Sequence, residues 1–413
     1  MRNFGTRGSR GWLAIWTTAA ILAADAVTWA QTPDALPTRG AALDVARDAR
    51  VGEVSPPGRT VLERALYWYD TQSVLDRLVR GWHGLHVVGG RFAAGAGSAL
   101  GVGYTASTRA LAVNAEVAGS SRGSARGLLE LTARRIGRAP IDVTVHARGS
   151  DAPQEDFFGL GMSSRVEDRT NYLLTSVEGG ATVTWHAAPG LDVAGGIGYL
   201  SPRVGHGTDP LLPSTEETFE TAAIPGYLDR DDFLHTDIAV TYDRRDLPRH
   251  PHTGGRYGAR LATYRDRDRH TFRRTELSAE QYVPLPNRYR TLAVAASAVL
   301  TASGDGIDVP FYLQPSLGGA SRLRGFREFR FQDRNAVAMT AEYRWEAWWA
   351  LDGALFVDAG TVASSPGRLR VKDVAVSYGV GLRLHSNSAL VTRLDLAFSR
   401  EGFIPLLRFE HVF

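Results

Sequence analysis

Apolar and polar residues alternate with a period of two from about Trp82 to the end of the chain. In the clearest run, apolar residues occupy every even position from Val374 to Leu384, and small or polar residues every odd position from Ala375 to His385. Side chains on a strand point alternately to opposite faces, so this pattern predicts strands with one apolar and one polar face. Similar runs recur along the chain and predict roughly sixteen strands.

The connections between these runs alternate in length. Tight connections such as PLPNRY, WWALDG and SNS alternate with long polar ones near 149–168, 201–231 and 303–334. Short turns on one side, long loops on the other and strands of about ten residues are typical of an outer-membrane β-barrel. Backbone groups in lipid must pair internally, so such a sheet closes on itself. We therefore predict an all-β, transmembrane antiparallel β-barrel over residues 83–413, with a polar lumen.

Periodicity alone does not separate this barrel from a soluble β-sandwich or propeller, which shows the same alternation with the polar face outside. Aromatic residues gathered near strand ends favour the barrel, as in AEYRWEAWW at 341–349. The chain also ends on an alternating strand, LLRFEHVF, which resembles the C-terminal signal of bacterial outer-membrane barrels. The residues that share its face are Leu407, Phe409, His411 and Phe413.

The first 82 residues do not follow the period of two. Residues 1–30 combine a basic start, an apolar stretch too short to span a bilayer, and small residues before Gln31. They predict a cleaved signal peptide, with an N-terminal anchor helix as the alternative. Residues 31–58 have the composition of a linker. Residues 59–80 have helical spacing and predict an amphipathic helix, either packed on the main domain or lying at a membrane interface.

Composition narrows the class of protein further. The chain has 47 Lys and Arg against 44 Asp and Glu, and this near balance argues against a nucleic-acid partner, which would require a basic face. It has no cysteine, so an exported protein of this kind needs a large core or a closed sheet in place of disulfides. Beyond the predicted signal peptide, no segment has the roughly 18 consecutive apolar residues of a membrane helix.

The segment GGASRLRGF at 318–326 places Arg324 among glycines in one of the long loops. On the predicted strands that follow, alternation puts Glu342 on the polar face of one strand and Asp358 on the polar face of the next. A guanidinium that reaches both carboxylates would make charge-assisted, forked contacts. Buried ion pairs are often neutral for stability. We therefore expect Arg324 to fix the position of the loop in the lumen, with glycines permitting tight backbone turns.

Several segments resemble, in family order, motifs of the BamA/TamA-type surface-antigen barrels. LGGASRLRGF resembles the family's loop motif, and AEYRWE and LFVDAG resemble the two strand motifs that follow it. Upstream, TYDRRDLPRHPHTGG and DFFGLGMSS resemble a turn and a loop of the same barrels. The resemblance is closer over 232–413 than over 83–231. The loop-anchoring residues that it identifies are Leu323, Arg324, Gly325 and Phe326, and their lumen partners are Glu342, Phe356, Asp358 and Gly360.

This resemblance implies a sixteen-stranded barrel whose sixth extracellular loop folds into the lumen. It also implies insertion of outer-membrane proteins, or translocation of polypeptides or lipid-linked cargo, often through a lateral seam between the first and last strands. The expected partners are outer-membrane lipid and lipopolysaccharide, periplasmic protein or lipid clients, and a second copy of the chain. Residues 31–82 are too few for the periplasmic POTRA domains of such barrels, which predicts a branch without them. A passive pore or structural barrel is the alternative.

Other chemistry is less well supported. His250 and His252 offer two imidazoles on a turn, but no cysteine or nearby group of carboxylates completes a metal site in the sequence. GDGIDV at 304–309 lacks the ligand series of a calcium loop, and the acidic residues of 229–232 have the pattern of a solvated loop surface. No serine lies in a recognisable nucleophile setting, so a barrel lipid hydrolase is the least favoured alternative. We expect no catalytic residue, metal, cofactor or enzyme activity.

Overall fold

The computed structural model describes most of the chain from residue 83 onward. The described ranges are 83–91, 98–227, 229–248, 250–266, 270–286, 290–304, 307–348, 351–385 and 390–408. The predicted signal peptide, the linker, the predicted helix at 59–80 and the C-terminal residues Phe409, His411 and Phe413 lie outside them. The predictions made for those segments therefore remain predictions.

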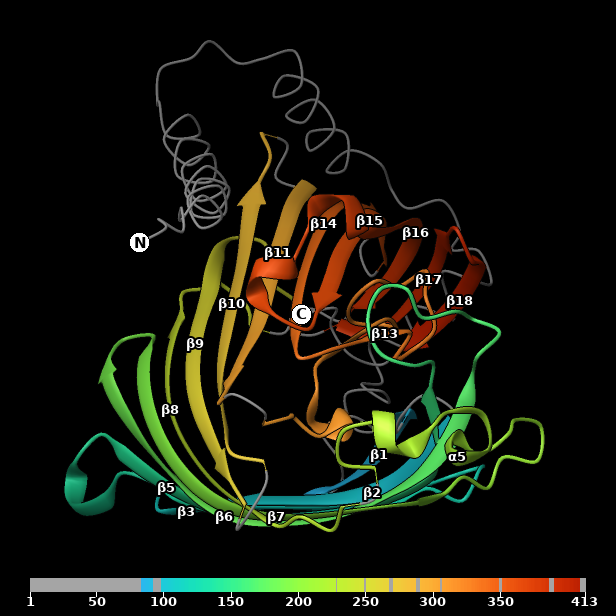
Figure 1. The fold of residues 1–413 in the computed structure, drawn as a ribbon. Coiled ribbons are helices and arrows are strands. Elements are labelled where there is room, and N and C mark those ends of the chain that lie inside the picture. Colours follow the sequence, from blue (N-terminus) through green and yellow to red (C-terminus); the bar gives the residue numbers. More distant parts are fainter. Residues whose placement is uncertain are drawn as a thin grey trace, which may run out of the picture.

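One antiparallel sheet of sixteen strands dominates the fold and curves strongly around an interior (Figure 1). The strands of this sheet are β1 (Leu85–Arg91), β2 (Ser98–Ser107), β3 (Leu111–Ser120), β4 (Ala125–Ala133), β5 (Ile141–Phe157), β6 (Thr170–Ala188), β7 (Leu191–His206), β8 (Phe233–Asp243), β9 (Gly254–Arg265), β10 (Phe272–Pro284), β11 (Arg290–Ser303), β14 (Asn335–Trp348), β15 (Leu351–Ala363), β16 (Ala375–His385), β17 (Leu390–Ser399) and β18 (Gly402–Arg408). Each strand pairs with its neighbours in chain order, which confirms the predicted fold class.

The two edge strands of this sheet are not joined to each other. Within the described residues, β1 pairs only with β2, and β18 pairs only with β17. The sheet is therefore curved but not closed by hydrogen bonds, whereas the sequence predicted a closed barrel. No helix among the described residues has the length and apolarity needed to cross a membrane.

The predicted alternation of faces is confirmed on the strands. On β15, Leu355 and Val357 are about half exposed and point outward, while Phe356 and Asp358 are buried and point inward. The same holds on β16, where Tyr378 is exposed and Ser377 is fully buried. The outer face of the sheet is thus apolar, and its inner face carries polar and charged side chains, as a strand protein in lipid requires.

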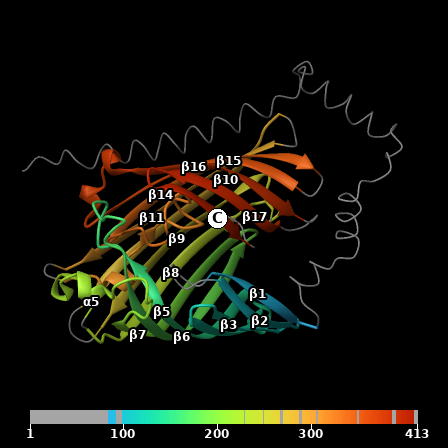
Figure 2. The same cartoon turned by 90° about the vertical axis from the view of Figure 1, so that its right-hand side faces the viewer.

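The connections fall on two ends of the sheet, as Figure 2 shows from the side. We call the end with the short connections, such as 189–190 between β6 and β7, the turn side. The opposite end, with the long connections 158–169, 207–232 and 304–334, is the loop side. The connection 304–334 contains a separate two-stranded sheet formed by β12 (Ser316–Leu317) and β13 (Phe331–Gln332). It is the sixth connection on the loop side.

Three strands are longer than the sequence predicted. β5 has 17 residues, β6 has 19 and β7 has 16, against an expectation of about ten. Residues 149–157 and 201–206 belong to the polar segments that the sequence predicts as long connections, whereas in the structure β5 and β7 continue through them. Pro153 is accommodated at a register shift between Ala152 and Glu155, since a proline lacks the amide donor that a regular ladder needs.

The 207–232 connection contains the short helix α5 (Thr215–Thr218), which begins with a capping box between Ser214 and Glu217. Beside it, Glu216 accepts hydrogen bonds from the Ser214 hydroxyl at 2.6 Å, from His206 Nδ1 at 2.6 Å, and from the Tyr227 hydroxyl. Burial acts to raise the pKa of Glu216, but these hydrogen bonds outweigh it and lower the pKa from 4.5 to about 2.

We predict that the 207–232 connection loses order as the pH falls from 4.5 towards 2. The pKa of Glu216 is lower in the folded protein than in the unfolded chain, so its stabilising effect is complete above pH 4.5 and is lost as the carboxylate protonates. Pepsin cleavage within 207–232 should increase across this pH range, after correction with an unfolded substrate. Glu216→Gln, which cannot titrate, should show a much smaller change. An identical pH response in both proteins would contradict the prediction.

Candidate functional site

The sixth loop-side connection, residues 304–334, folds into the space enclosed by the sheet (Figure 1). Apolar side chains from the connection pack on small residues of the inner face of the sheet. The cluster comprises Leu317, Leu323, Phe326 and Phe331 from the connection, with Ala336, Ala338, Val362 and Ala375 from the sheet or its rim. Complete burial of such a side chain contributes roughly 1.5–3 kcal/mol. This packing provides the apolar stabilisation of the inserted loop, as the loop-anchoring prediction requires.

Arg324 is fully buried and binds the two carboxylates that the sequence predicted. Its Nε and Nη2 donate to Asp358 at 2.9 and 2.8 Å, and its Nη1 donates to Glu342 at 2.7 Å. The backbone amide of Arg324 also donates to Asp358, at 3.0 Å. Burial acts to lower the pKa of Arg324, but these carboxylates raise it above its ordinary value, so the guanidinium stays charged.

Two other residues of the LFVDAG segment, Phe356 and Gly360, support this contact. The guanidinium carbon of Arg324 lies 3.4 Å from the centre of the Phe356 ring, which places the cation over the aromatic face. A Cβ on Gly360 would lie 2.8 Å from Leu317 Cδ1 and 3.3 Å from Leu323 Cδ1. Glycine at position 360 therefore leaves the space that the apolar side chains of the loop occupy.

Three further charged residues belong to the same buried network, and the sequence did not identify them as partners. Arg383 on β16 donates to Glu342 at 2.9 Å and to Asp395 at 2.5 Å. Asp395 on β17 also lies 3.5 Å from Arg393 Nη1 and 3.6 Å from Arg324 Nη1. Arg393 donates in turn to the carbonyl of Ala320 in the loop, at 2.6 Å. The signal for them was present, as charged residues on the inward positions of alternating strands.

The balance of charge shows which carboxylate depends on Arg324. The network holds four arginines, counting Arg344 at 2.8 Å from Glu342, against three carboxylates. Without Arg324, Glu342 would keep Arg344 and Arg383. Among the side chains of the described residues, Asp358 would keep the hydrogen bond from the Ser377 hydroxyl, at 3.3 Å. Loss of the Arg324 side chain thus leaves Asp358 buried without a cationic partner, with hydrogen bonds from a backbone amide and a hydroxyl alone.

The role of the glycine after Arg324 differs from the predicted one. Gly325 does not have a positive φ; instead, a Cβ there would lie 2.7 Å from Ser377 Cβ and from the carbonyl oxygen of Phe398. Gly325 therefore allows the loop to approach β16 and β17 closely, and its carbonyl accepts a 2.6 Å hydrogen bond from Ser399. Positive φ angles occur instead before Arg324, at Gly318 (121°), Gly319 (83°) and Leu323 (57°), so the glycines on that side do permit tight turns.

A second arginine, Arg330, holds the part of the loop that follows Arg324, and no motif in the sequence pointed to it. Arg330 is buried, and its Nε donates to Glu401 in the β17–β18 connection at 2.9 Å. Its Nη atoms donate to the hydroxyl and carbonyl of Ser164 in the β5–β6 connection, at 2.8 and 2.7 Å. The guanidinium also lies 5.3 Å from the Phe158 ring. The DFFGLGMSS segment thus contacts the inserted loop.

Two other expectations need correction. The acidic residues near 229–232 are not simply a solvated surface, because Asp229 and Asp231 both lie 3.1 Å from Nε2 of the buried His270. His250 also has carboxylate and imidazole neighbours from distant strands, which are described below. Of the C-terminal signal, only Leu407 lies among the described residues, and it is exposed on the outer face.

Comparisons with known proteins agree with this architecture. The Omp85 superfamily domain matches residues 215–402. The fold is similar to that of BamA from Haemophilus ducreyi lacking POTRA domains 1–3, with 15% identity, a TM-score of 0.58, and coverage of 79% of this chain and 71% of that chain. Lower similarity links it to CdiB from Acinetobacter baumannii (12% identity, 76% and 54% coverage, TM-score 0.45) and from Escherichia coli (12%, 80% and 61%, 0.48). No curated protein matches the sequence.

We predict that Arg324→Ala destabilises the protein by about 3–5 kcal/mol, because it leaves the Asp358 carboxylate in the interior without its cationic partner. The measurement is equilibrium unfolding in urea, together with trypsin cleavage within 304–334, which should become faster. Arg327→Ala, at an exposed position of the same loop, is the matched control; it removes one trypsin site, so it should leave the free energy of unfolding unchanged and should not accelerate cleavage. The double variant Arg324→Ala/Asp358→Ala should recover part of the loss. Equal stability of the Arg324 and Arg327 variants would contradict the assigned anchoring role.

Proposed function

We propose that the chain is an outer-membrane barrel that inserts proteins into the membrane or translocates polypeptides across it, because the Omp85 superfamily domain matches residues 215–402. The proposed action is not enzymatic. It consists of guiding a client chain along or through the curved sheet. The proposed clients are periplasmic polypeptides, and the surrounding partners are outer-membrane lipid and lipopolysaccharide. Lipid-linked cargo and self-association are further proposals of the same kind.

The observation that carries the proposal is the pair of sheet edges. β1 and β18 are the first and last strands, and neither pairs with the other within the described residues. An unpaired edge presents a row of backbone donors and acceptors that can bind an added strand. In a membrane these groups must find partners, because the hydrocarbon offers none. A client strand that binds β1 or β18 would satisfy them while it enters the bilayer.

The inserted loop supports the same proposal by a different route. It occupies the interior next to β14 to β17, the strands that lead to the β18 edge, and it is hydrogen-bonded to β17 through Ser399 and Arg393. A loop held by charged contacts to these strands would maintain their spacing while a client engages the edge. We therefore assign Arg324 a positioning role in the proposed activity.

A passive pore is the second candidate, and one observation favours it. A partly open cavity of about 320 Å³ lies between the inserted loop and β10, β11 and β14. The polar residues among those that line it include Ser278, Ser297, Thr340, Arg322 and Glu328. A polar cavity beside a removable loop could become a water-filled path. The lipid-hydrolase alternative has no comparable support and remains the least favoured.

We predict that a covalent link between β1 and β18 blocks insertion of clients. The chain has no cysteine, so Val87→Cys/Leu407→Cys introduces a single pair on the outward faces of the two edge strands. After reaction with a short bis-maleimide, protein reconstituted in liposomes should no longer accelerate folding of an unfolded outer-membrane barrel, followed by its heat-modifiable migration on gels. Unmodified protein should remain active.

The matched control keeps Leu407→Cys and moves its partner to β17. Leu394 and Leu407 are Cα partners in the β17–β18 ladder, so linking them constrains strands that are already paired. This link should leave activity unchanged. Full activity with β1 linked to β18 would contradict the seam mechanism, and no activity in any variant or in the unmodified protein would favour the passive barrel.

We also predict that Arg324→Ala raises the conductance of the protein in planar bilayers by at least several-fold, because the loop that fills the interior is released. Arg327→Ala should conduct like the unmodified protein. Unchanged conductance in the Arg324 variant, despite faster trypsin cleavage of the loop, would show that the loop does not obstruct the path.

A further inference from the structure

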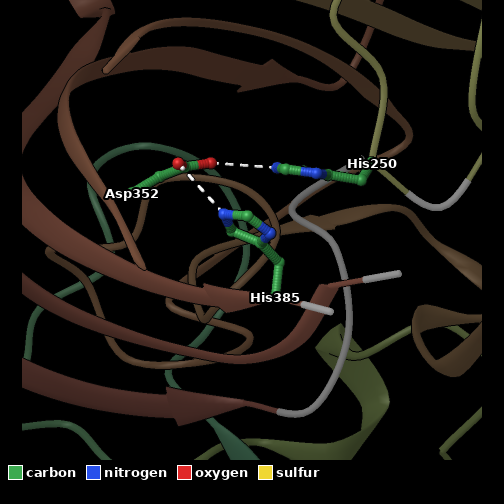
Figure 3. Close-up of side chains that lie close together, drawn as sticks. All are labelled: His250, Asp352 and His385. Carbon is green, nitrogen blue, oxygen red and sulfur yellow. Dashed lines mark hydrogen bonds and ion pairs between the residues drawn. The ribbon is translucent and has the colours of Figure 1, made fainter. Parts of the chain in front are cut away.

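We propose that His250, Asp352 and His385 form a site for a divalent transition-metal ion, with Zn²⁺ the best match, at the turn side of the sheet. The three residues come from separate elements: the β8–β9 connection, the start of β15 and the end of β16. In Figure 3 both imidazole rings point towards the carboxylate from different sides. The sequence showed no cysteine or group of carboxylates near His250, and in the structure one carboxylate and a second imidazole from distant strands complete the group.

The distances fit a shared ion. His250 Nε2 lies 2.9 Å from one carboxylate oxygen of Asp352, and His385 Nε2 lies 3.2 Å from the other. One ligand atom from each residue lies within 4.8 Å of the others. A tetrahedral site with bonds of 2.0–2.1 Å has ligands about 3.3 Å apart. Small rotations of these side chains would bring the three ligand atoms to that spacing.

The group is enclosed and holds two imidazoles beside one carboxylate. His250 and Asp352 are buried, and the rings of His250 and His385 are tilted by 31° with centroids 4.3 Å apart. The Asp352 carboxylate would balance part of the charge of a divalent ion shared by the two imidazole nitrogens.

The donor set selects the class of metal. Two imidazole nitrogens with one carboxylate suit Zn²⁺ and its neighbours in the first transition row, whereas Ca²⁺ and Mg²⁺ require mainly oxygen ligands. The chain supplies no thiolate that would compete elsewhere. The ring of His252 lies 4.5 Å from that of His250, so the fourth ligand would be either water or His252.

Neighbouring charges leave the carboxylate available. Asp352 is the Cα partner of Arg383 in the β15–β16 ladder, but the guanidinium of Arg383 is directed to Glu342 and Asp395. The turn that carries His250 is itself held in shape. Asp246 accepts hydrogen bonds from the backbone amides of His252 at 2.9 Å and Thr253 at 3.2 Å.

A bound ion would join parts of the sheet that are not neighbours. β9 and β15 are separated in the sheet by β10, β11 and β14, so the β8–β9 connection must cross the interior to reach Asp352. The metal would fasten this crossing and restrict the turn-side end of the interior. Asp352 also lies on the same inward face of β15 as Asp358, roughly 20 Å along the strand. One strand would thus carry the ion at one end and the Arg324 contact farther along.

The test uses the full chain without a polyhistidine tag, stripped with a chelator and then titrated with ZnCl₂ in detergent. We expect one tight Zn²⁺ per chain by calorimetry and metal analysis, with a higher melting temperature when Zn²⁺ is present. Titration with CoCl₂ should give the visible absorption of a four-coordinate nitrogen and oxygen site. His385→Ala and Asp352→Asn should each weaken Zn²⁺ binding by at least about 100-fold. Loss of a residue that only hydrogen-bonds a ligand costs up to about 100-fold, and loss of a direct ligand should cost at least as much.

His270→Ala is the matched control, because it removes a buried histidine from the other group of carboxylates, Asp229 and Asp231, on the loop side. It should leave Zn²⁺ affinity unchanged. Heat-modifiable migration confirms that each variant is folded, and a variant that fails this check is replaced by His385→Gln. Zn²⁺ affinity that is equal in the unmodified protein and the His385 and Asp352 variants, or no Zn²⁺ binding by the folded unmodified protein, would overturn the proposal.

Discussion

The contact between Arg324 and Asp358 is the constraint on which the interior arrangement depends. A single carboxylate accepts hydrogen bonds from the backbone amide, Nε and Nη2 of the same residue. The contact therefore fixes both the path of the loop backbone and the orientation of its side chain. The apolar residues beside it stabilise the inserted state but could pack in more than one way. The charged contact selects one position, since a displaced guanidinium would leave buried carboxylates without partners.

This constraint in turn requires the surrounding strands to hold their register. Asp358 and Glu342 lie on adjacent strands, and Phe356 and Glu342 are Cα partners in the β14–β15 ladder. A shift of one residue would turn the carboxylates towards the outer apolar face. Arg383 and Asp395 extend the same requirement to β16 and β17. The inserted loop and the C-terminal strands therefore specify each other's positions, which links the interior of the sheet to its β18 edge.

The sequence allowed correct prediction of the features that depend on local pattern. Alternation identified the sheet, its two faces and the inward positions of Glu342 and Asp358, and the resemblance to surface-antigen barrels assigned Arg324 to them. It did not predict contacts that depend on how distant connections fold. Arg330 contacts Ser164 and Glu401, and His250 contacts Asp352, which lies 102 residues away. The period of two does not predict either set of contacts. The extra length of β5 to β7 was also not predicted. Beyond the alternating apolar positions these segments contain polar residues and Pro153, a composition that is also typical of loops.

Because the strands differ in length, the sheet extends farther on the loop side at some strands than at others. At roughly 3.3 Å per residue and a tilt of about 45°, the 19 residues of β6 rise about 44 Å, whereas the ten residues of β3 rise about 23 Å. An outer apolar band is about 25 Å tall, so β3 matches the bilayer while β6 extends far beyond it. The loop-side ends of β5 to β7 therefore project beyond the bilayer into water on one side of the interior. A large molecule approaching from the loop side would meet these strand ends before it reaches the shorter strands β3 and β4.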